Sequence, residues 1–97
     1  MELKNKVVII TGAAGRIGSA TAEKLLKNGA NVVLADINQD NLVKLYDLLL
    51  QKKIGKLTFF KCDITLESEI NALLTYTFDF FGGIHAAIHC AYPVSLG

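Results

Sequence analysis

Apolar runs of strand length alternate along the chain with longer segments in which apolar residues recur at helical spacing. The runs cover residues 6–11, 31–36, 57–62 and 84–89. Each run carries few polar residues, a pattern typical of strands that are buried on both faces. The sequence therefore predicts four strands, each separated from the next by room for a helix.

The segments between these strands predict helices. Residues 16–28 have helical spacing, and Gly29 follows at the position where a helix would end. Asn38 is a good N-cap for a second helix, which we expect to stop at Gly55. The expected buried positions are Ile17, Ala20, Thr21 and Leu25 in the first helix and Leu42, Leu45 and Leu49 in the second.

A third helix is expected to follow Thr65, which can cap it. Glu67 and Glu69 would then lie in its first turn, where the helix dipole favours carboxylates. Gly82 and Gly83 would end the helix. Its expected buried stripe consists of Ile70, Leu73, Leu74, Thr77, Phe78 and Phe81.

Strands and helices thus alternate, and no hairpin signal such as Asn-Gly joins two strands. Strands that are buried on both faces and followed by helices indicate a parallel sheet with right-handed crossovers. A chain of 97 residues, 52% of them hydrophobic, forms one domain at most. We predict an α/β fold.

Three glycines stand where the first strand ends and the first helix begins. Gly12 lets the chain turn tightly, Gly15 lets the backbone approach a pyrophosphate, and Gly18 lets the helix pack closely on the strand. Asp36 ends the second strand, close to the ~20 residues expected before a carboxylate that binds ribose hydroxyls. The alternative is a tight turn with an incidental acid. A P-loop is excluded because the turn contains no lysine.

Charge and composition exclude several classes of function. The net charge is +1 and the basic residues are spread along the chain, so no stripe for nucleic acid is present. No apolar run approaches the ~20 residues of a membrane span, and no signal-peptide pattern occurs, so we expect a cytoplasmic protein. Cys62 and Cys90 lie far apart in apolar segments, which predicts buried thiols and no metal site.

The segment TGAAGRIG, residues 11–18, resembles the Thr-Gly nucleotide motif of the short-chain dehydrogenase/reductase family. Its spacing is TGxxGxxG, as in the extended members, many of which act on nucleotide sugars. The commoner spacing, TGxxxGxG, would place glycine where Arg16 stands. The resemblance runs from about Lys4 to Pro93 and implies a Rossmann-like parallel sheet in the strand order 3-2-1-4, truncated after the fourth strand.

A second motif, CDIT at residues 62–65, is similar to the acidic turn that follows the third strand in this family. The resemblance implies that Asp63 accepts a hydrogen bond from the adenine amino group and that Ile64 lies against the ring. Asp63 could instead cap its own turn or the third helix.

A third motif, AIHCAYP at residues 87–93, falls where many members have Asn-Asn-Ala-Gly and extended members have His-Leu-Ala-Ala. His89 and Ala91 match the second pattern, whereas Tyr92 and Pro93 depart from both. Ala91 would let the backbone approach the nicotinamide-side ribose. The residues expected to bind the dinucleotide are Gly12, Ala14, Gly15, Arg16, Ile17, Gly18, Asp36, Ile37, Asp63, Ile64 and Ala91.

Asp36 favours NAD over NADP as the cofactor, because a carboxylate binds ribose hydroxyls and repels a 2′-phosphate. Arg16 acts in the other direction, since a guanidinium beside the turn could meet a phosphate, although it could also be a solvated residue at the helix start. We interpret His85 and His89 as structural residues rather than catalytic ones.

The catalytic Tyr-x-x-x-Lys pair of the family is missing. The residues four positions after Tyr46, Tyr76 and Tyr92 are Leu50, Phe80 and Leu96. We therefore expect residues 1–97 to be the N-terminal portion of a single NAD(P)-binding domain, a fragment with no catalytic residue and no turnover of its own. We also expect the isolated polypeptide to be poorly soluble or to self-associate, because its fourth strand leaves an uncovered edge.

Three hypotheses on function follow. The first is the cofactor-binding half of an NAD(P)-dependent oxidoreductase that moves hydride between nicotinamide and a hydroxyl or carbonyl carbon, with an extended-type nucleotide-sugar epimerase or dehydratase as a variant. The second is a non-catalytic NAD(H)-binding sensor or scaffold. The third, a methyltransferase of similar topology, is disfavoured by Thr11 before the first glycine. For the full-length protein we expect a small-molecule substrate, a homo-oligomer, and no nucleic-acid or membrane partner.

Overall fold

The computed structural model describes residues 2–90 of the chain. Strands and helices alternate throughout, as the hydrophobic pattern predicts. The elements are β1 (Val7–Thr11), α1 (Arg16–Lys27), β2 (Asn31–Asp36), α2 (Gln39–Gln51), β3 (Leu57–Lys61), α3 (Glu67–Phe81) and β4 (Ala86–His89).

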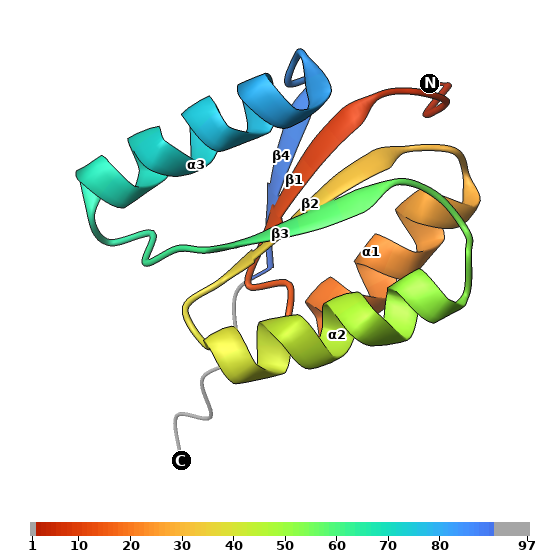
Figure 1. The fold of residues 1–97 in the computed structure, drawn as a ribbon, viewed down its shortest axis with the longest axis horizontal. Coiled ribbons are helices and arrows are strands. Elements are labelled where there is room, and N and C mark those ends of the chain that lie inside the picture. Colours follow the sequence, from red (N-terminus) through yellow and green to blue (C-terminus); the bar gives the residue numbers. More distant parts are fainter. Residues whose placement is uncertain (1, 91–97) are drawn as a thin grey trace.

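The strands form one parallel sheet in the order β3-β2-β1-β4, so the predicted α/β fold and strand order are confirmed (Figure 1). β1 lies between β2 and β4, with Thr11 opposite Ala35 on one side and His89 on the other. The strands that follow β1 in sequence therefore lie on both sides of it, β2 and β3 on one side and β4 on the other, which makes β1 the switch point of the sheet. In such sheets, ligands bind at the carboxyl ends of the strands beside this point.

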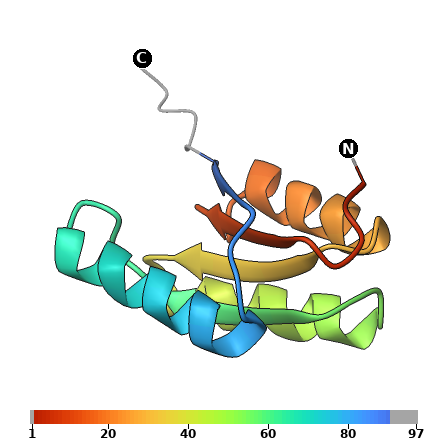
Figure 2. The ribbon, with the colours of Figure 1, turned by 90° about the horizontal axis from the view of Figure 1, so that it is seen from above.

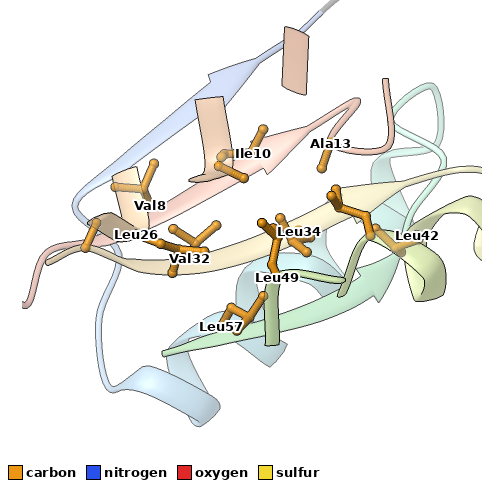
Figure 3. Packing of buried hydrophobic residues seen from close by; sticks show 12 residues of the cluster. Val8, Ile10, Ala13, Leu26, Val32, Leu34, Leu42, Leu49 and Leu57 are labelled. Carbon is orange, nitrogen blue, oxygen red and sulfur yellow. The ribbon is translucent and has the colours of Figure 1, made fainter. Parts of the chain in front are cut away.

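Helices cover both faces of the sheet. In Figure 1, α1 and α2 lie below the sheet and α3 lies above it, and Figure 2 shows the same layers from a second side. On the α1 and α2 face, Leu26, Leu42 and Leu49 pack against β1 and β2 (Figure 3). The smaller cluster on the α3 face includes Ile9, Val33, Ala35, Cys62 and Leu73.

The buried face of α1 differs from the predicted one by one position. Gly18, Ala22 and Leu26 are buried, whereas Ile17 is 58% exposed. The reason is the close packing of Gly18, since a Cβ there would lie 2.8 Å from the Ala13 Cα. This contact sets the rotation of the helix and turns the stripe that follows Gly18 toward the sheet, while Leu25 stays partly buried at the border.

The second helix follows the prediction. The Asn41 N–H donates to Asn38 Oδ1 over 3.0 Å, so Asn38 is the N-cap. The three predicted leucines of this helix are buried. The helix ends at Gln51, earlier than the Gly55 stop that the sequence suggested.

The third helix corrects two expectations. Its N-cap is Leu66, not Thr65, and no side chain caps it; the Thr65 hydroxyl is turned toward the preceding residues and donates to Asp63 Oδ1. Only Leu73 and Thr77 of the expected stripe are fully buried, and Phe78 is 58% exposed. The physical reason is that α3 packs over one part of its sheet face, which leaves only a narrow stripe of the helix in contact.

The fourth strand is half-buried. Ala86 and Ile88 pack against the larger core cluster, whereas Ala87 and His89, on the α3 side, are exposed. Ile84 precedes the strand and is exposed. Within residues 2–90, no helix is long and apolar enough to cross a membrane.

Candidate functional site

The loop after β1 is built around a tight turn at Gly12. Its φ of +69° lies in the left-handed region, and a Cβ there would collide with the carbonyl oxygen of Cys90. The Cys90 N–H donates to the Thr11 carbonyl over 2.9 Å, and the Gly15 N–H donates to the Gly12 carbonyl over 3.2 Å. Gly12 thus packs directly against the backbone at the end of β4.

Gly18 brings the first turn of α1 onto the same loop. A Cβ at this position would collide with the Gly12 carbonyl oxygen and lie 2.8 Å from the Ala13 Cα. Ala13 itself is buried and its N–H donates to the Ala35 carbonyl over 3.1 Å. The structure therefore shows the predicted tight turn at Gly12 and the predicted close helix packing at Gly18.

The amino end of α1 carries no side-chain cap. Its N-cap is Gly15, in an extended conformation, and no acidic residue lies in the first turn. The N–H groups at a helix start have no partners within the helix, and the helix dipole makes this end positive. Arg16 and Ile17, the first helical residues, are exposed. A phosphate is the type of ligand that this arrangement suits.

Asp36 connects this loop to the next one. The Ala14 N–H donates to Asp36 Oδ2 over 3.0 Å, and the Asn38 N–H donates to Asp36 Oδ1 over 2.9 Å. The carboxylate at the end of β2 is therefore held beside the glycine loop. An ionised carboxylate has about four acceptor sites, so two remain for further donors such as ribose hydroxyls.

Asp63 lies at the same edge of the sheet, because the Cys62 N–H donates to the Asp36 carbonyl over 3.0 Å. Its Oδ1 accepts from the Thr65 hydroxyl over 2.6 Å and from the Thr65 N–H over 2.9 Å. These two bonds hold the pKa of the Asp63 carboxyl below its ordinary value. Asp63 thus stabilises its own turn, which is the structural alternative that the sequence left open.

Two exposed isoleucines flank these acids. Ile37 is 60% exposed and follows Asp36, and Ile64 is 40% exposed and follows Asp63. An exposed apolar side chain next to each of the two carboxylates suits a ligand that is apolar with polar edges. Ala91, with Tyr92 and Pro93, lies outside the described residues.

The two cysteines differ in their surroundings. Cys62 is buried, and burial, with the nearby carboxylates of Glu69 and Asp63, raises the pKa of its thiol. Cys90 is partly buried at the end of β4. Neither thiol pairs with the other, and residues 2–90 contain no cluster of three metal-ligating side chains.

The role of the histidines is the feature that sequence reasoning described least. His89 Nδ1 lies 2.8 Å from Thr11 Oγ1, and the Val7 N–H donates to His85 Nδ1 over 2.9 Å. Both side chains therefore bind β4 to β1. Each partner is 78 positions away in the sequence, so only the strand order could have indicated these pairs.

Comparison with known proteins agrees with this geometry. Residues 6–92 match the family model described as short chain dehydrogenase. The chain belongs to the short-chain dehydrogenase family. Among its relatives is the 2,5-dichloro-2,5-cyclohexadiene-1,4-diol dehydrogenase of Sphingobium indicum, which is 38% identical over 90 residues that make up 93% of this chain and 34% of the relative.

Another family relative is the post-translational flagellin modification protein A of Campylobacter coli, 34% identical over 95% of this chain and 36% of the relative. A solved short chain dehydrogenase from Mycobacterium smegmatis has a TM-score of 0.88 at 36% identity, over 93% of this chain and 38% of its own. A Burkholderia phymatum member in complex with NAD has a TM-score of 0.86 at 30% identity, over 90% of this chain and 31% of its own.

This member of the family spans about a third of the length of the relatives that it matches. It corresponds to their N-terminal, cofactor-binding portion. The family resemblance inferred from the glycine loop is thus confirmed, and related members bind NAD.

Proposed function

We propose that this chain forms the dinucleotide-binding portion of an NAD-dependent oxidoreductase, with residues 1–97 as the N-terminal part of a single domain. The observation that carries the proposal is the bond from the Ala14 N–H to Asp36 Oδ2, 3.0 Å long. It joins a carboxylate suited to ribose hydroxyls to a glycine loop suited to a pyrophosphate. Both groups then face one ligand.

The proposed cofactor contacts follow the chain of the dinucleotide. The pyrophosphate meets the backbone of Gly12, Ala14 and Gly15 and the first turn of α1, with Arg16, Ile17 and Gly18. Asp36 accepts from the adenosine ribose. The adenine lies between Ile37 and Ile64 with its amino group on Asp63, and Ala91 approaches the nicotinamide-side ribose.

NAD is favoured over NADP because Asp36 would repel a 2′-phosphate. The relatives described as NAD-bound, a xylitol dehydrogenase and the Burkholderia phymatum protein, support this choice. Arg16 is exposed and would favour NADP if its guanidinium reached the 2′-phosphate. Comparison of NADH with NADPH in one titration separates the two cofactors.

The bound nicotinamide supplies hydride transfer to or from a hydroxyl or carbonyl carbon. The residues of this chain bind and orient the cofactor, and none of them is proposed to move a proton of the substrate. The proton donor in the family is the tyrosine of a Tyr-x-x-x-Lys pair, which we propose lies in a longer form of the protein. The purified chain of residues 1–97 should accordingly show no dehydrogenase turnover, and a measurable rate would refute this assignment.

Two alternatives rest on specific residues. The TGxxGxxG spacing of residues 11–18 and the His89 motif favour an extended-type enzyme that acts on nucleotide sugars. An NAD(H)-binding sensor without catalysis would use the same loop. A longer reading frame distinguishes them, since a Tyr-x-x-x-Lys pair beyond residue 97 favours an enzyme and its absence favours a sensor.

The test of binding is a calorimetric titration of the chain with NADH, NADPH and S-adenosylmethionine. We expect NADH to bind most tightly, and Asp36→Ala to weaken its binding by roughly 1–3 kcal/mol through the loss of charged hydrogen bonds. Asp47→Ala, an exposed acid in α2, is the matched control and should leave binding unchanged. Tighter binding of S-adenosylmethionine, or equal binding by the Asp36 variant, would overturn the proposal.

A further inference from the structure

Both histidines of the chain lie at the ends of the β4 pairing and both contact β1 through the same ring nitrogen. At the amino end, the Val7 N–H donates to His85 Nδ1 over 2.9 Å. At the carboxyl end, His89 Nδ1 lies 2.8 Å from Thr11 Oγ1. β4 is four residues long and, within residues 2–90, pairs on one side only. The two side-chain bonds add to the backbone pairing at the two ends of this short strand.

The two partners differ in what they tolerate. A backbone N–H can only donate, so the bond from Val7 requires an unprotonated Nδ1 on His85, with the ring proton on Nε2. A doubly protonated imidazole has no acceptor left. The Thr11 hydroxyl can either donate or accept, so its bond with His89 can form in both protonation states.

We propose that His85 makes the amino end of β4 an acid-sensitive attachment to β1, whereas the carboxyl end, held by His89, is insensitive to acid. His85 is exposed, so protons reach its ring from solvent. The backbone N–H of His85 donates to the Val7 carbonyl over 2.9 Å, so two hydrogen bonds join these residues. Protonation of the imidazole breaks the bond from the Val7 N–H to Nδ1, because two donors, Nδ1–H and the Val7 N–H, then face each other.

The charged groups around the two rings do not offset this effect. Lys6 precedes β1, Asp79 lies near the end of α3, and Glu2 and Lys4 belong to the segment before β1. At the carboxyl edge of the sheet, where His89 lies, the charged residues include Arg16 of α1, Asp36 of β2, Lys61 of β3 and Asp63. Among residues 2–90, no carboxylate oxygen lies within 4.0 Å of either imidazole, so no ion pair stabilises a protonated ring in place.

The effect is confined to the amino end of the β1–β4 pairing. At the carboxyl end, the Cys90 N–H donates to the Thr11 carbonyl over 2.9 Å and Gly12 packs against the Cys90 carbonyl, and both contacts are between backbone groups that do not change protonation. The inference rests on the strand pairing alone and holds whether or not NAD is the ligand.

The test is amide hydrogen exchange on the purified chain at low micromolar concentration, at about pH 7.5 and about pH 5.0, on either side of the ordinary imidazole titration. Exchange is corrected for the intrinsic effect of pH, and a peptide from β2 serves as the internal reference. In the unmodified chain, the protection of the Val7 amide should fall roughly fivefold relative to β2 on acidification, the effect of one lost hydrogen bond.

Two matched variants identify the group responsible. His85→Asn places an amide oxygen at the position of Nδ1 that does not titrate, so the acid-dependent fall should disappear. His89→Asn should keep the fall of the unmodified chain. The proposal is overturned if His85→Asn still loses protection in acid, if His89→Asn abolishes the loss, or if β2 loses protection together with Val7.

Discussion

The amino ends of α1 and α2 lie at the same edge of the sheet and on the same face, yet only one of them has a side-chain cap. The start of α2 is closed, with Asn38 Oδ1 accepting from the Asn41 N–H and Asp40 in the first turn. The start of α1 has glycine at the N-cap, no side-chain acceptor and no acid. The N–H groups at the start of α2 thus have a side-chain acceptor, whereas the start of α1 has no side-chain cap.

Under the proposed function, the missing cap of α1 marks the phosphate site. A side-chain cap stabilises a helix by about 1 kcal/mol, so a helix without one gives up stability that α2 retains. Asp36 stands between the two ends and accepts from Ala14 on one side and Asn38 on the other. Its carboxylate holds the loops before α1 and before α2 in place, but it does not cap α1.

The largest loss of stability is expected from Gly12→Ala, which should disrupt the tight turn between β1 and α1. A left-handed backbone costs an alanine about 1–2 kcal/mol, and the collision with the Cys90 carbonyl adds about 1–3 kcal/mol. Urea unfolding measures the loss. Gly82→Ala is the matched control, because φ is +80° there but nothing lies within 4 Å of the added Cβ, so only the first cost applies. Equal losses in the two variants would contradict the close contact.

Gly15→Asp converts the α1 terminus into one that resembles the α2 terminus. Since φ is −75° and ψ is 170° at this residue, an aspartate fits the backbone and should change stability by only a few tenths of a kcal/mol. NADH binding should weaken at least tenfold, roughly 1.4 kcal/mol or more, because the new charge faces the pyrophosphate. Calorimetric titration checks this, and unchanged affinity would show that the α1 terminus is not the phosphate site.

Asn38→Ala performs the opposite exchange on α2. Removal of its cap should destabilise the chain by about 1 kcal/mol in urea unfolding and leave NADH affinity close to that of the unmodified chain. Asn38→Asp, which can still accept from the Asn41 N–H, should recover the stability. If Asn38→Ala weakens binding as much as Gly15→Asp does, the two helix ends do not have separate roles.

The smallest effect extends the comparison to the turn before α3. Thr65→Val removes the hydroxyl that donates to Asp63 Oδ1, so the pKa of Asp63 should rise toward its ordinary value. Because that pKa is lowered in the folded chain, the stability it contributes is present above the ordinary aspartate range and is lost as pH falls through the lowered pKa. The variant should lose less stability in acid. Titration of the Asp63 carboxyl carbon by nuclear magnetic resonance measures the shift, and an unmoved pKa would refute it.

Most of the fold could be predicted from residues read in order. The apolar runs located all four strands to within two residues at each end, and Asn38 located the start of α2. The glycine loop and Asp36 were recognised as one motif because their spacing follows a simple rule. Each of these signals depends on residues close together in the chain.

The errors arise where a contact outside the helix itself decides. The face of α1 was misplaced because Gly18 must contact Gly12 and Ala13, which no periodicity within the helix reveals. Thr65 is a residue type that often caps helices, but its hydroxyl bonds to Asp63 and the N-cap is Leu66. Phe78 belongs to an apolar stripe that the sheet does not reach.

The sequence by itself determined the order of elements, the tight turn at Gly12 and the bare start of α1, because strand period, backbone freedom and capping are properties of a few adjacent residues. Only the tertiary structure decided that Asp36 meets Ala14 and that Val7 meets His85, since those pairs depend on which strands become neighbours and in what register. Register is fixed by the packing of the whole sheet against its helices, and that packing is a sum over contacts between distant segments.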